Sequence, residues 1–321
     1  MTMHASIVNA DVASIQKAAI LLAEGKLVAF PTETVYGLGA DATNDRAVAA
    51  IYAAKGRPQF NPLIIHVANP EALDGLIEWN ETARLLAAQF WPGPLTLVLP
   101  RKKSCPVSLL ASAGMDTLAV RIPSHPVAKQ LLEAVKRPIA APSANASGKL
   151  SPTTPIHVAE SLYDKVDLIL AGGKSQVGLE STVLNLTSTR PAILRPGGIT
   201  REQLEKILGP IDIVSVAENT SLMSPGMLAS HYAPNLPLRL NAMQAESDEG
   251  FLTFGPDILA KGGAQRLNLS PQGDLSEAAA NLFTMLRQLD QSQLRGIAVM
   301  PIPNIGLGVA INDRLNRAAV R

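Results

Sequence analysis

The chain has 321 residues, of which 47% are hydrophobic and 17% are charged, and its formal net charge is +1. That length exceeds one ordinary hydrophobic core, so we expect two domains, and the apolar content is too high for extensive disorder. A net charge near zero argues against a protein that coats nucleic acid by bulk charge. Cys105 is the only cysteine, which excludes an intramolecular disulfide and a cysteine-rich zinc site.

No segment of the sequence approaches the ~18 uninterrupted apolar residues of a membrane span. Residues 1–10 lack the basic region and apolar core of a signal peptide. We therefore expect a cytoplasmic protein.

Helices and short apolar strands alternate along residues 1–210. In chain order, helices are predicted at 14–24, 45–55, 81–90, 126–135, 156–162 and 200–208, and strands at 26–30, 62–67, 95–99, 117–122, 138–141, 166–170, 181–186 and 192–194. Residues 31–40 are predicted to be a loop, because Pro31 ends a strand. Several strands follow one another without a helix, which predicts an α/β or α+β domain with a largely buried, mixed sheet.

The regular pattern stops near residue 211. Residues 211–237 are predicted to form an ordered linker that folds back as a lid, because a flexible spacer would not keep the adjacent His231 and Tyr232. Strands near 238, at 250–254 and at 296–300, with a helix at 276–289 and another at the end of the chain, predict a small Rossmann-like parallel-sheet domain over 238–321.

Lys55-Gly-Arg57 follows a predicted helix and lies on a turn bounded by Pro58. Cations at a helix end often only complement the helix dipole, so a surface-charge role is one interpretation. Two cations fixed on a tight turn also suit a phosphate chain. The polar Asn61, just before the next strand, favours the phosphate interpretation.

Two polar side chains, Ser143 and Asn145, follow the strand predicted at 138–141. A loop beyond the carboxyl end of a strand is where open α/β sheets bind ligands. Serine and asparagine are also ordinary turn residues, so a plain turn is the alternative.

His66 and Arg121 each interrupt an apolar strand. A lone histidine in such a strand is often a satisfied core residue. A buried arginine, in contrast, needs an anionic partner. No carboxylate lies close to Arg121 in the sequence, so its partner is either a substrate carboxylate or a distant structural Asp or Glu.

The familiar motifs for nucleotides and nucleophiles are incomplete. Gly172-Gly-Lys-Ser175 lacks the first glycine of a phosphate-binding loop, and no serine lies in a GxSxG turn. His, Asp and Glu show no metal-ligand spacing. The prominent polar groups are donors, which suit the binding and charge stabilisation of a polyanion better than proton abstraction.

Together these motifs carry a resemblance to a known family. Lys55-Gly-Arg57 and Ser143-Ala-Asn145, behind Phe30-Pro-Thr-Glu-Thr-Val-Tyr-Gly-Leu-Gly39, resemble the YrdC-like family. Trp91-Pro-Gly-Pro-Leu-Thr96, Val120-Arg-Ile-Pro123, Glu180-Ser-Thr182 and Leu194-Arg-Pro-Gly197 match the same pattern. Ser224-Pro-Gly-Met227, His231-Tyr-Ala-Pro234 and the C-terminal domain resemble its long form. The resemblance implies a twisted mixed sheet with an open cleft.

The resemblance also implies an activity: L-threonine, bicarbonate and ATP give L-threonylcarbamoyladenylate and pyrophosphate, for the threonylcarbamoyladenosine modification of tRNA. It assigns threonine to Thr34, His66, Arg121, Ala141 and Ser181. It assigns ATP to Arg57, Asn61, Thr117, Ser143, Asn145, Ser151, Arg195 and either His231 or Tyr232. Lys55 and Arg57 would neutralise charge on the phosphates, and Mg²⁺ would be held through the phosphates and by no protein side chain.

The product of this reaction would pass to a tRNA threonylcarbamoyl-transferase complex, and direct contact with tRNA is weakly supported. One alternative is a YrdC-like module that binds RNA or serves translation without catalysis, although the near-zero net charge weakens it. Another is a carbamoyl-transfer enzyme of the hydrogenase-maturation type. Such enzymes also carry a cysteine-rich zinc segment, which a single cysteine excludes.

Overall fold

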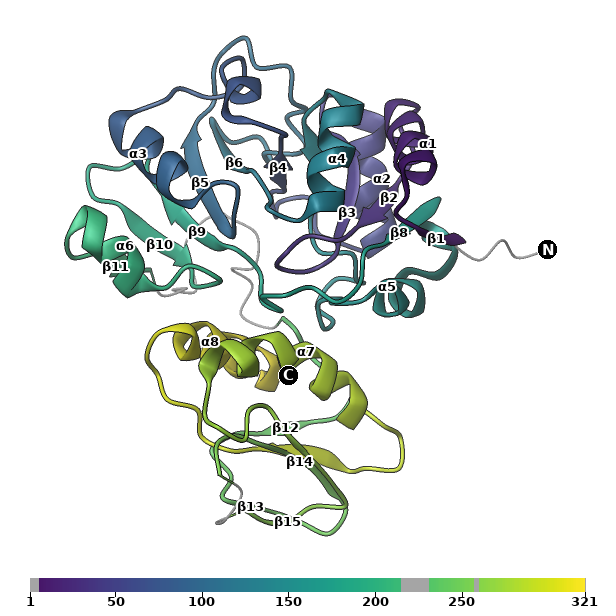
Figure 1. The fold of residues 1–321 in the computed structure, drawn as a ribbon, viewed down its shortest axis with the longest axis vertical. Coiled ribbons are helices and arrows are strands. Elements are labelled where there is room, and N and C mark those ends of the chain that lie inside the picture. Colours follow the sequence, from purple (N-terminus) through teal and green to yellow (C-terminus); the bar gives the residue numbers. More distant parts are fainter. Residues whose placement is uncertain (1–5, 215–230, 257–259, 321) are drawn as a thin grey trace.

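The computed structural model describes residues 6–214, 231–256 and 260–320. Its larger part, which we call the N-terminal domain (residues 6–214), is built on an 11-stranded mixed sheet in the order β1-β8-β2-β3-β7-β4-β6-β5-β9-β10-β11 (Figure 1). The strands are β1 (Ser6–Asn9), β2 (Val28–Phe30), β3 (Gly37–Asp41), β4 (Ile64–His66), β5 (Leu95–Pro100), β6 (Thr117–Arg121), β7 (Ile139–Ala140), β8 (Leu168–Ala171), β9 (Thr182–Asn185), β10 (Ala192–Arg195) and β11 (Asp212–Ile213).

Helices are packed against this sheet through two apolar cores. They are α1 (Val12–Ala23), α2 (Asp45–Lys55), α3 (Glu81–Phe90), α4 (Pro126–Val135), α5 (Pro155–Leu162) and α6 (Arg201–Leu208). Helices α1 and α4 pack on each other and share one core with Phe30. The other four helices contribute to a larger core. Helix α6 begins with a capping box, in which Thr200 is the N-cap and Gln203 the second residue.

The main difference from the predicted elements is β3, which lies within the segment predicted to be a loop. Its glycines lower β propensity, but the structure requires at least one of them. A Cβ on Gly39 would lie 2.8 Å from the ring of Phe30, so only glycine lets β3 approach β2 this closely. The short strands β1 and β11 were also not predicted.

The C-terminal domain (residues 231–320) has a four-stranded parallel sheet in the order β12-β17-β14-β16. The strands are β12 (Leu238–Arg239), β14 (Glu249–Thr253), β16 (Gln265–Asn268) and β17 (Gly296–Val299), beside a small pair, β13 (Gln244–Ala245) and β15 (Lys261–Gly262). Helices α7 (Leu275–Leu289) and α8 (Leu307–Ala319) lie between this sheet and the N-terminal domain (Figure 1). The parallel sheet that was predicted for this domain is confirmed, and its Rossmann-like character stays a prediction.

The two domains are packed closely together. Leu150 and Leu179 of the N-terminal domain belong to the same buried apolar cluster as Phe283 of α7. Gly178 lies directly against α7, since a Cβ there would come within 2.5 Å of the helix backbone. The helices of the C-terminal domain are therefore fixed against the loop that precedes β9.

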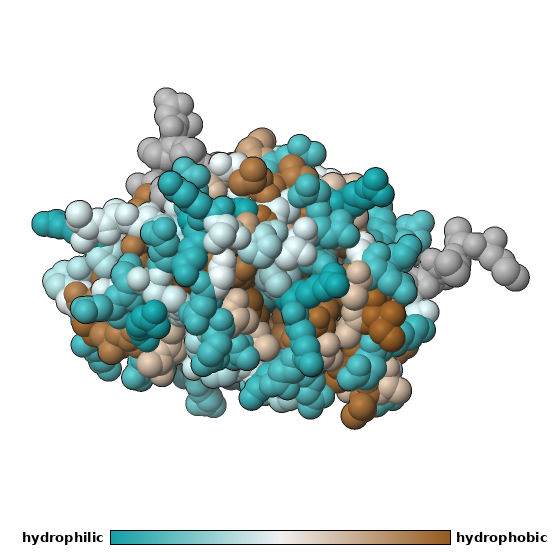
Figure 2. Space-filling view, turned by 90° about the horizontal axis from the view of Figure 1, so that it is seen from above, coloured by the Kyte–Doolittle hydropathy of each residue, from teal (hydrophilic) through white to brown (hydrophobic). Residues whose placement is uncertain are grey.

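Over the residues that the structure describes, no helix is long and apolar enough to cross a membrane. The face shown in Figure 2 is mainly hydrophilic, and its apolar residues form separate small patches. Such scattered patches are ordinary for a protein surface.

Candidate active site

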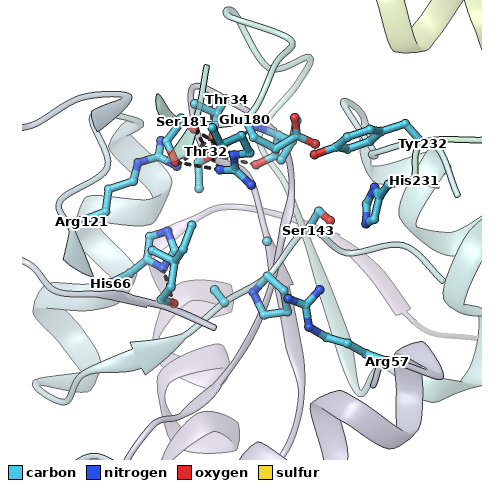
Figure 3. Close-up of a pocket in the computed structure, with 16 residues that line it drawn as sticks. Thr32, Thr34, Arg57, His66, Arg121, Ser143, Glu180, Ser181, His231 and Tyr232 are labelled. Carbon is cyan, nitrogen blue, oxygen red and sulfur yellow. Dashed lines mark hydrogen bonds between the residues drawn. The ribbon is translucent and has the colours of Figure 1, made fainter. Parts of the chain in front are cut away.

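A cavity of about 40 Å³ in the N-terminal domain is lined by strands β4 and β6, by the loop that follows β7 and by the segments that precede β3 and β9. Figure 3 shows two groups of side chains around it. Arg121 and His66 lie at one end, and Arg57, His231 and Tyr232 lie at the other, with Ser143 between them. The register of β4 and β6 explains the first group, because these parallel strands pair His66 with Arg121.

The cavity brings together all five residues that the resemblance assigns to threonine. They are Thr34, His66, Arg121, Ala141 and Ser181. From the set assigned to ATP, the lining residues are Arg57, Ser143, Arg195, His231 and Tyr232. Asn61, Thr117, Asn145 and Ser151 do not line the cavity. Thr117 begins β6, about 13 Å along the strand from Arg121, so it is the most remote from the first group.

Arg121 has the carboxylate partner that the sequence did not reveal. Its Nη2 donates to Glu33 Oε1 at 2.6 Å, and both side chains are buried. Nη1 donates to Thr34 Oγ1 at 3.0 Å and Nε to the Gly93 carbonyl at 3.1 Å. Three of the five guanidinium N–H groups are thus engaged among the described residues, which leaves two for a ligand. One arginine can therefore form a structural ion pair and still offer two donors to a ligand.

The neighbours of the Thr34 hydroxyl determine which hydrogen bond it donates and which it accepts. Thr32 Oγ1 donates to the Val35 carbonyl at 2.6 Å, so the 2.8 Å bond between the two threonine hydroxyls uses the proton of Thr34. Thr34 also accepts from Arg121. Its remaining lone pair can therefore only accept, which suits an N–H or O–H group of a substrate.

His66 is neutral at physiological pH. Burial, and the nearby charge of Arg121, lower the pKa of its imidazole from 6.5 to about 3. Its Nδ1 lies 3.2 Å from the Ile64 carbonyl and donates to it, which leaves the lone pair on Nε2. His66 is thus a second acceptor at this end of the cavity, and the core-histidine alternative does not explain why it lines the cavity.

Lys55 and Arg57 are both buried, so the surface-charge interpretation is wrong. Arg57 lines the cavity and donates from Nη2 to the Pro62 carbonyl at 2.9 Å. Burial lowers the pKa of its guanidinium to about 10, which still leaves it cationic at neutral pH. Lys55 does not line the cavity, in contrast to its predicted contact with phosphate. Its Nζ lies 2.5 Å from the carbonyls of Ser143 and Asn145 and holds that loop.

The residues around Ser143 explain how the loop presents polar groups. The Asn145 Nδ2 donates to the carbonyls of Ala146 and Lys149, both at 2.8 Å. Its Oδ1 is buried without a partner in the described part of the chain, as are both polar atoms of the Asn61 side chain. Buried polar atoms are rarely left unpaired. Both amides are therefore suited to a ligand that completes their hydrogen bonds.

Arg195 and Ser181 face each other across the ends of β9 and β10. Arg195 Nη2 donates to the Ser181 carbonyl at 2.9 Å and to its Oγ at 3.2 Å. The Ser181 Oγ also lies 2.7 Å from Thr96 Oγ1. The guanidinium therefore holds Ser181 at the boundary between the two ends of the cavity.

Glu180 is a lining residue that sequence reasoning missed. It accepts hydrogen bonds from Ser151 and from Arg314 Nε, the latter at 2.9 Å. These contacts and the charge of Arg195 outweigh burial and lower the pKa of the carboxyl to about 2, so it is ionised. Thr32 and Glu33 were also missed. The sequence indicated only that the motif Glu180-Ser-Thr182 and the segment 30–39, which contain these three residues, match the family pattern.

The structure describes only the two ends of the predicted linker, and its role as a lid stays a prediction. Residues 215–230, including Ser224-Pro-Gly226, lie outside the described residues. His231 and Tyr232 both line the cavity, and their rings are 4.1 Å apart. Burial lowers the pKa of His231 to about 3, so this imidazole is also neutral.

The cavity carries an excess of positive charge. Arg57, Arg121 and Arg195 line it, against one lining carboxylate among the described residues, that of Glu180. Within the described ranges no group of three or more His, Cys, Asp or Glu is placed to hold a metal ion. Glu33 pairs with Arg121 but does not line the cavity, so the lining itself is rich in guanidinium groups, which favour an anionic ligand.

The ion pair of Arg121 and Glu33 yields a prediction about stability. Arg121→Leu should lower the free energy of unfolding by about 3–5 kcal/mol, because it leaves Glu33 buried and unpaired. The double variant Arg121→Leu, Glu33→Leu should recover most of that loss. Urea denaturation of the two variants and the wild type measures both values. A single variant as stable as the wild type would contradict the pairing.

His66 yields a prediction about pH. Its folded-state pKa of about 3 lies below the ordinary 6.5, so on acidification the unfolded chain binds a proton that the folded protein does not. The stabilisation is complete above pH 6.5 and is lost as the pH falls toward 3. Between pH 6 and 4, His66→Gln should reduce the pH slope of the unfolding free energy by ~1.4 kcal/mol per pH unit. An unchanged slope in urea titrations would show that His66 is protonated in the folded state.

Comparison with known proteins identifies the family of the chain. The Sua5–YciO–YrdC family model, described as telomere recombination, matches residues 20–197. A second model, the threonylcarbamoyl-AMP synthase C-terminal domain, matches residues 199–320. The threonylcarbamoyl-AMP synthase of Pyrococcus abyssi is 43% identical over 95% of this chain and 94% of its own length. That of Bacillus subtilis is 43% identical over 95% and 92%.

Solved structures show the same fold. The crystal structure of P. abyssi Sua5 complexed with L-threonine matches with a TM-score of 0.90 and 40% identity, over 98% of this chain and 97% of that one. Escherichia coli YciO matches with a TM-score of 0.54 over 61% of this chain and 96% of its own; at 24% identity it supports the fold alone. The chain therefore belongs to the YrdC-like family, in the long form that carries the additional C-terminal domain.

Proposed function

We propose that the protein is a threonylcarbamoyl-AMP synthase, which converts L-threonine, bicarbonate and ATP into L-threonylcarbamoyladenylate and pyrophosphate. The observation that carries the proposal is one cavity with two chemically different ends. Arg121, His66 and Thr34 form the end that suits an amino acid, and Arg57 lies at the other end, which suits phosphates. The full-length similarity to proteins of that name supports it.

The amino-acid end matches threonine in charge and polarity. The two remaining N–H groups of Arg121 would bind the carboxylate. Thr34 and the Nε2 atom of His66 both accept, so they would receive the N–H and O–H groups of the substrate. Ser181 and Ala141 complete this end. A relative that was solved with L-threonine supports this substrate.

The nucleotide end would hold ATP through Arg57, Ser143, Arg195, His231 and Tyr232, which line the cavity. The side chains behind them, Asn61, Asn145 and Ser151, would complete the set, and Thr117 is the least supported member. Lys55 is better described as a positioning residue, because it holds the carbonyls of Ser143 and Asn145.

The chemistry consists mainly of positioning. The neutral amine of threonine takes up carbon dioxide as a carbamate, and a carbamate oxygen attacks the α-phosphate of ATP in line, releasing pyrophosphate. Arg57 and Arg195 would offset the charge that develops on the phosphates. Glu180 is ionised and already paired with Arg314, so it is a poor general base.

Mg²⁺ would be bound through the phosphates of ATP, whose charge it neutralises. Both oxygens of Glu180, the lining carboxylate, already accept hydrogen bonds from Ser151 and Arg314. The donor set of the cavity therefore suits phosphate oxygens better than a metal ion bound directly to the protein.

We place the activity in the cytoplasm, where a single cysteine suits reducing conditions. The product would serve the threonylcarbamoyl modification of tRNA through a separate transferase complex. His231 and Tyr232 would close the nucleotide end during the reaction, which would protect a reactive adenylate from water.

The decisive test is pyrophosphate release from the purified full-length chain with ATP and Mg²⁺. Release should require L-threonine and bicarbonate together, because the attacking carbamate exists only when both have combined. Serine and valine in place of threonine serve as matched amino-acid controls. Equal ATP turnover without threonine would refute the proposal.

Arg57 offers a test of the nucleotide end. Arg57→Ala should lower kcat/KM by on the order of 10²-fold or more, the cost of losing one donor to a developing charge. Circular dichroism checks that the fold is retained. The exposed Arg190, changed to alanine, is the matched control and should leave kcat/KM unchanged. Wild-type turnover of Arg57→Ala would remove this residue from the site.

A further inference from the structure

Helix α8 of the C-terminal domain carries an arginine that is buried at the boundary between the two domains. The side chain of Arg314 is 1% exposed. Its Nε donates to Glu180 Oε2 at 2.9 Å, and its Nη1 donates to Asp313 Oδ2 at 2.6 Å. A charge is costly to bury, so these contacts are what allow an arginine at this position.

Besides Asp313, Arg314 has two neighbours that belong to the wall of the cavity. Glu180 lines it from the N-terminal domain, and Tyr232 lines it from the first residues of the C-terminal domain. The guanidinium carbon lies 5.2 Å from the centre of the Tyr232 ring, within reach of a cation–π contact. Phe283 of α7 stacks on the same ring, with centroids 5.7 Å apart. Arg314 therefore joins two lining residues that are distant in sequence.

The same stretch of α8 also supports His231. Asp313 Oδ1 accepts from Arg317 Nε at 2.9 Å, and the Arg317 carbonyl accepts from the His231 backbone N–H at 3.3 Å. Asp313 thereby connects Arg314 and Arg317 on one face of the helix. Through these contacts α8 supports both residues that would close the nucleotide end.

The contacts of Arg314 are incomplete in the described structure. Its Nη2 is buried and has no partner among the described residues. Among the described residues, Asn61, Asn145 and His231 of the set assigned to ATP also have unpaired buried polar atoms, but so do Arg101, Ser175 and Arg287, which do not line the cavity. An unpaired nitrogen therefore does not distinguish Arg314 from other arginines of the chain. What distinguishes Arg314 is its contact with two residues of the cavity wall, Glu180 and Tyr232.

We propose that Arg314 is a positioning residue for the nucleotide end of the cavity. It holds Glu180 and Tyr232 in their places, so the C-terminal domain takes part in ATP binding and does not only enlarge the fold. This inference rests on the proposed function and adds to it a residue from the second domain. The amino-acid end, which Arg314 does not contact, should be independent of it.

The test uses the full-length chain with Arg314→Met, and calorimetry with α,β-methylene ATP and, separately, with L-threonine. Affinity for the ATP analogue should fall by roughly tenfold or more, since a misplaced binding group is costly. Affinity for threonine should change by less than about twofold. Arg239→Met is the matched control: it removes an arginine bound to the buried Glu249 in the same domain, away from the cavity, and should leave both affinities unchanged.

A second variant separates positioning from simple charge pairing. Arg314→Met leaves Glu180 unpaired and should lower Tm, whereas the double variant Arg314→Met, Glu180→Gln removes both charges and should recover Tm. We expect the double variant to keep the weak binding of the ATP analogue. If affinity returns together with Tm, Arg314 is only a counter-ion and the proposal is wrong.

Arg314→Lys covers the case in which the methionine variant does not fold. Lysine keeps the charge but lacks the planar fork that contacts Glu180 and Tyr232 together, so ATP-analogue affinity should fall while Tm stays high. Equal losses for the ATP analogue and threonine, in any folded variant, would overturn the inference. Failure of the wild type to release pyrophosphate would instead refute the proposed function, which distinguishes the two failures.

Discussion

The burial of positive charge beside the sheet is the constraint on which the cavity depends. Five basic side chains, Lys55, Arg57, Arg121, Arg195 and Arg314, are each 7% exposed or less. Two of them form ion pairs, Arg121 with Glu33 and Arg314 with Glu180. Lys55, Arg57 and Arg195 donate to backbone carbonyls, and burial lowers the pKa of Lys55 well below its usual value. Arg57 remains cationic in the cavity wall, and its charge favours an anionic ligand.

The buried basic residues have different roles in the cavity because their side chains have different partners. Arg121 is clamped by Glu33, Thr34 and Gly93, so its orientation does not depend on a ligand, and it can present a rigid pair of N–H groups. Lys55, in contrast, does not line the cavity. Its side chain holds the loop that carries Ser143. Neutral His66 and the accepting lone pair of Thr34 add polarity without charge. Such an arrangement matches the carboxylate, N–H and O–H groups of the proposed substrate.

Local features of the fold and site were predictable, and partners distant in the sequence were not. The helix at 126–135 has the bounds that its apolar spacing predicts, because Pro126 starts it and the pattern ends with Val135. Arg121 was singled out because a charge in an apolar strand is an anomaly. Glu33, 88 residues away, was not identified as its partner, since only the sheet brings the two together. Lys55 was assigned to phosphate for the same reason: the carbonyls that it binds belong to a loop 88–90 residues away. Strand β3 was missed because the close approach that requires Gly39 is a tertiary property.

The position of α7 and α8 gives the second domain a physical connection to the chemistry. Gly178, against the backbone of α7, is two residues from Glu180 and three from Ser181, so the packing of the domains and the wall of the cavity lie on one short segment. A shift of α7 would move this segment, and a shift of α8 would move the counter-ion of Glu180. Interdomain packing therefore affects the geometry of the nucleotide end in two ways. Gly178, which contacts α7, is close in sequence to Glu180, and Arg314 of α8 forms an ion pair with Glu180. A catalytic site that relies on positioning benefits from this coupling. Side chains that are held by both domains lose less conformational entropy when the ligand binds.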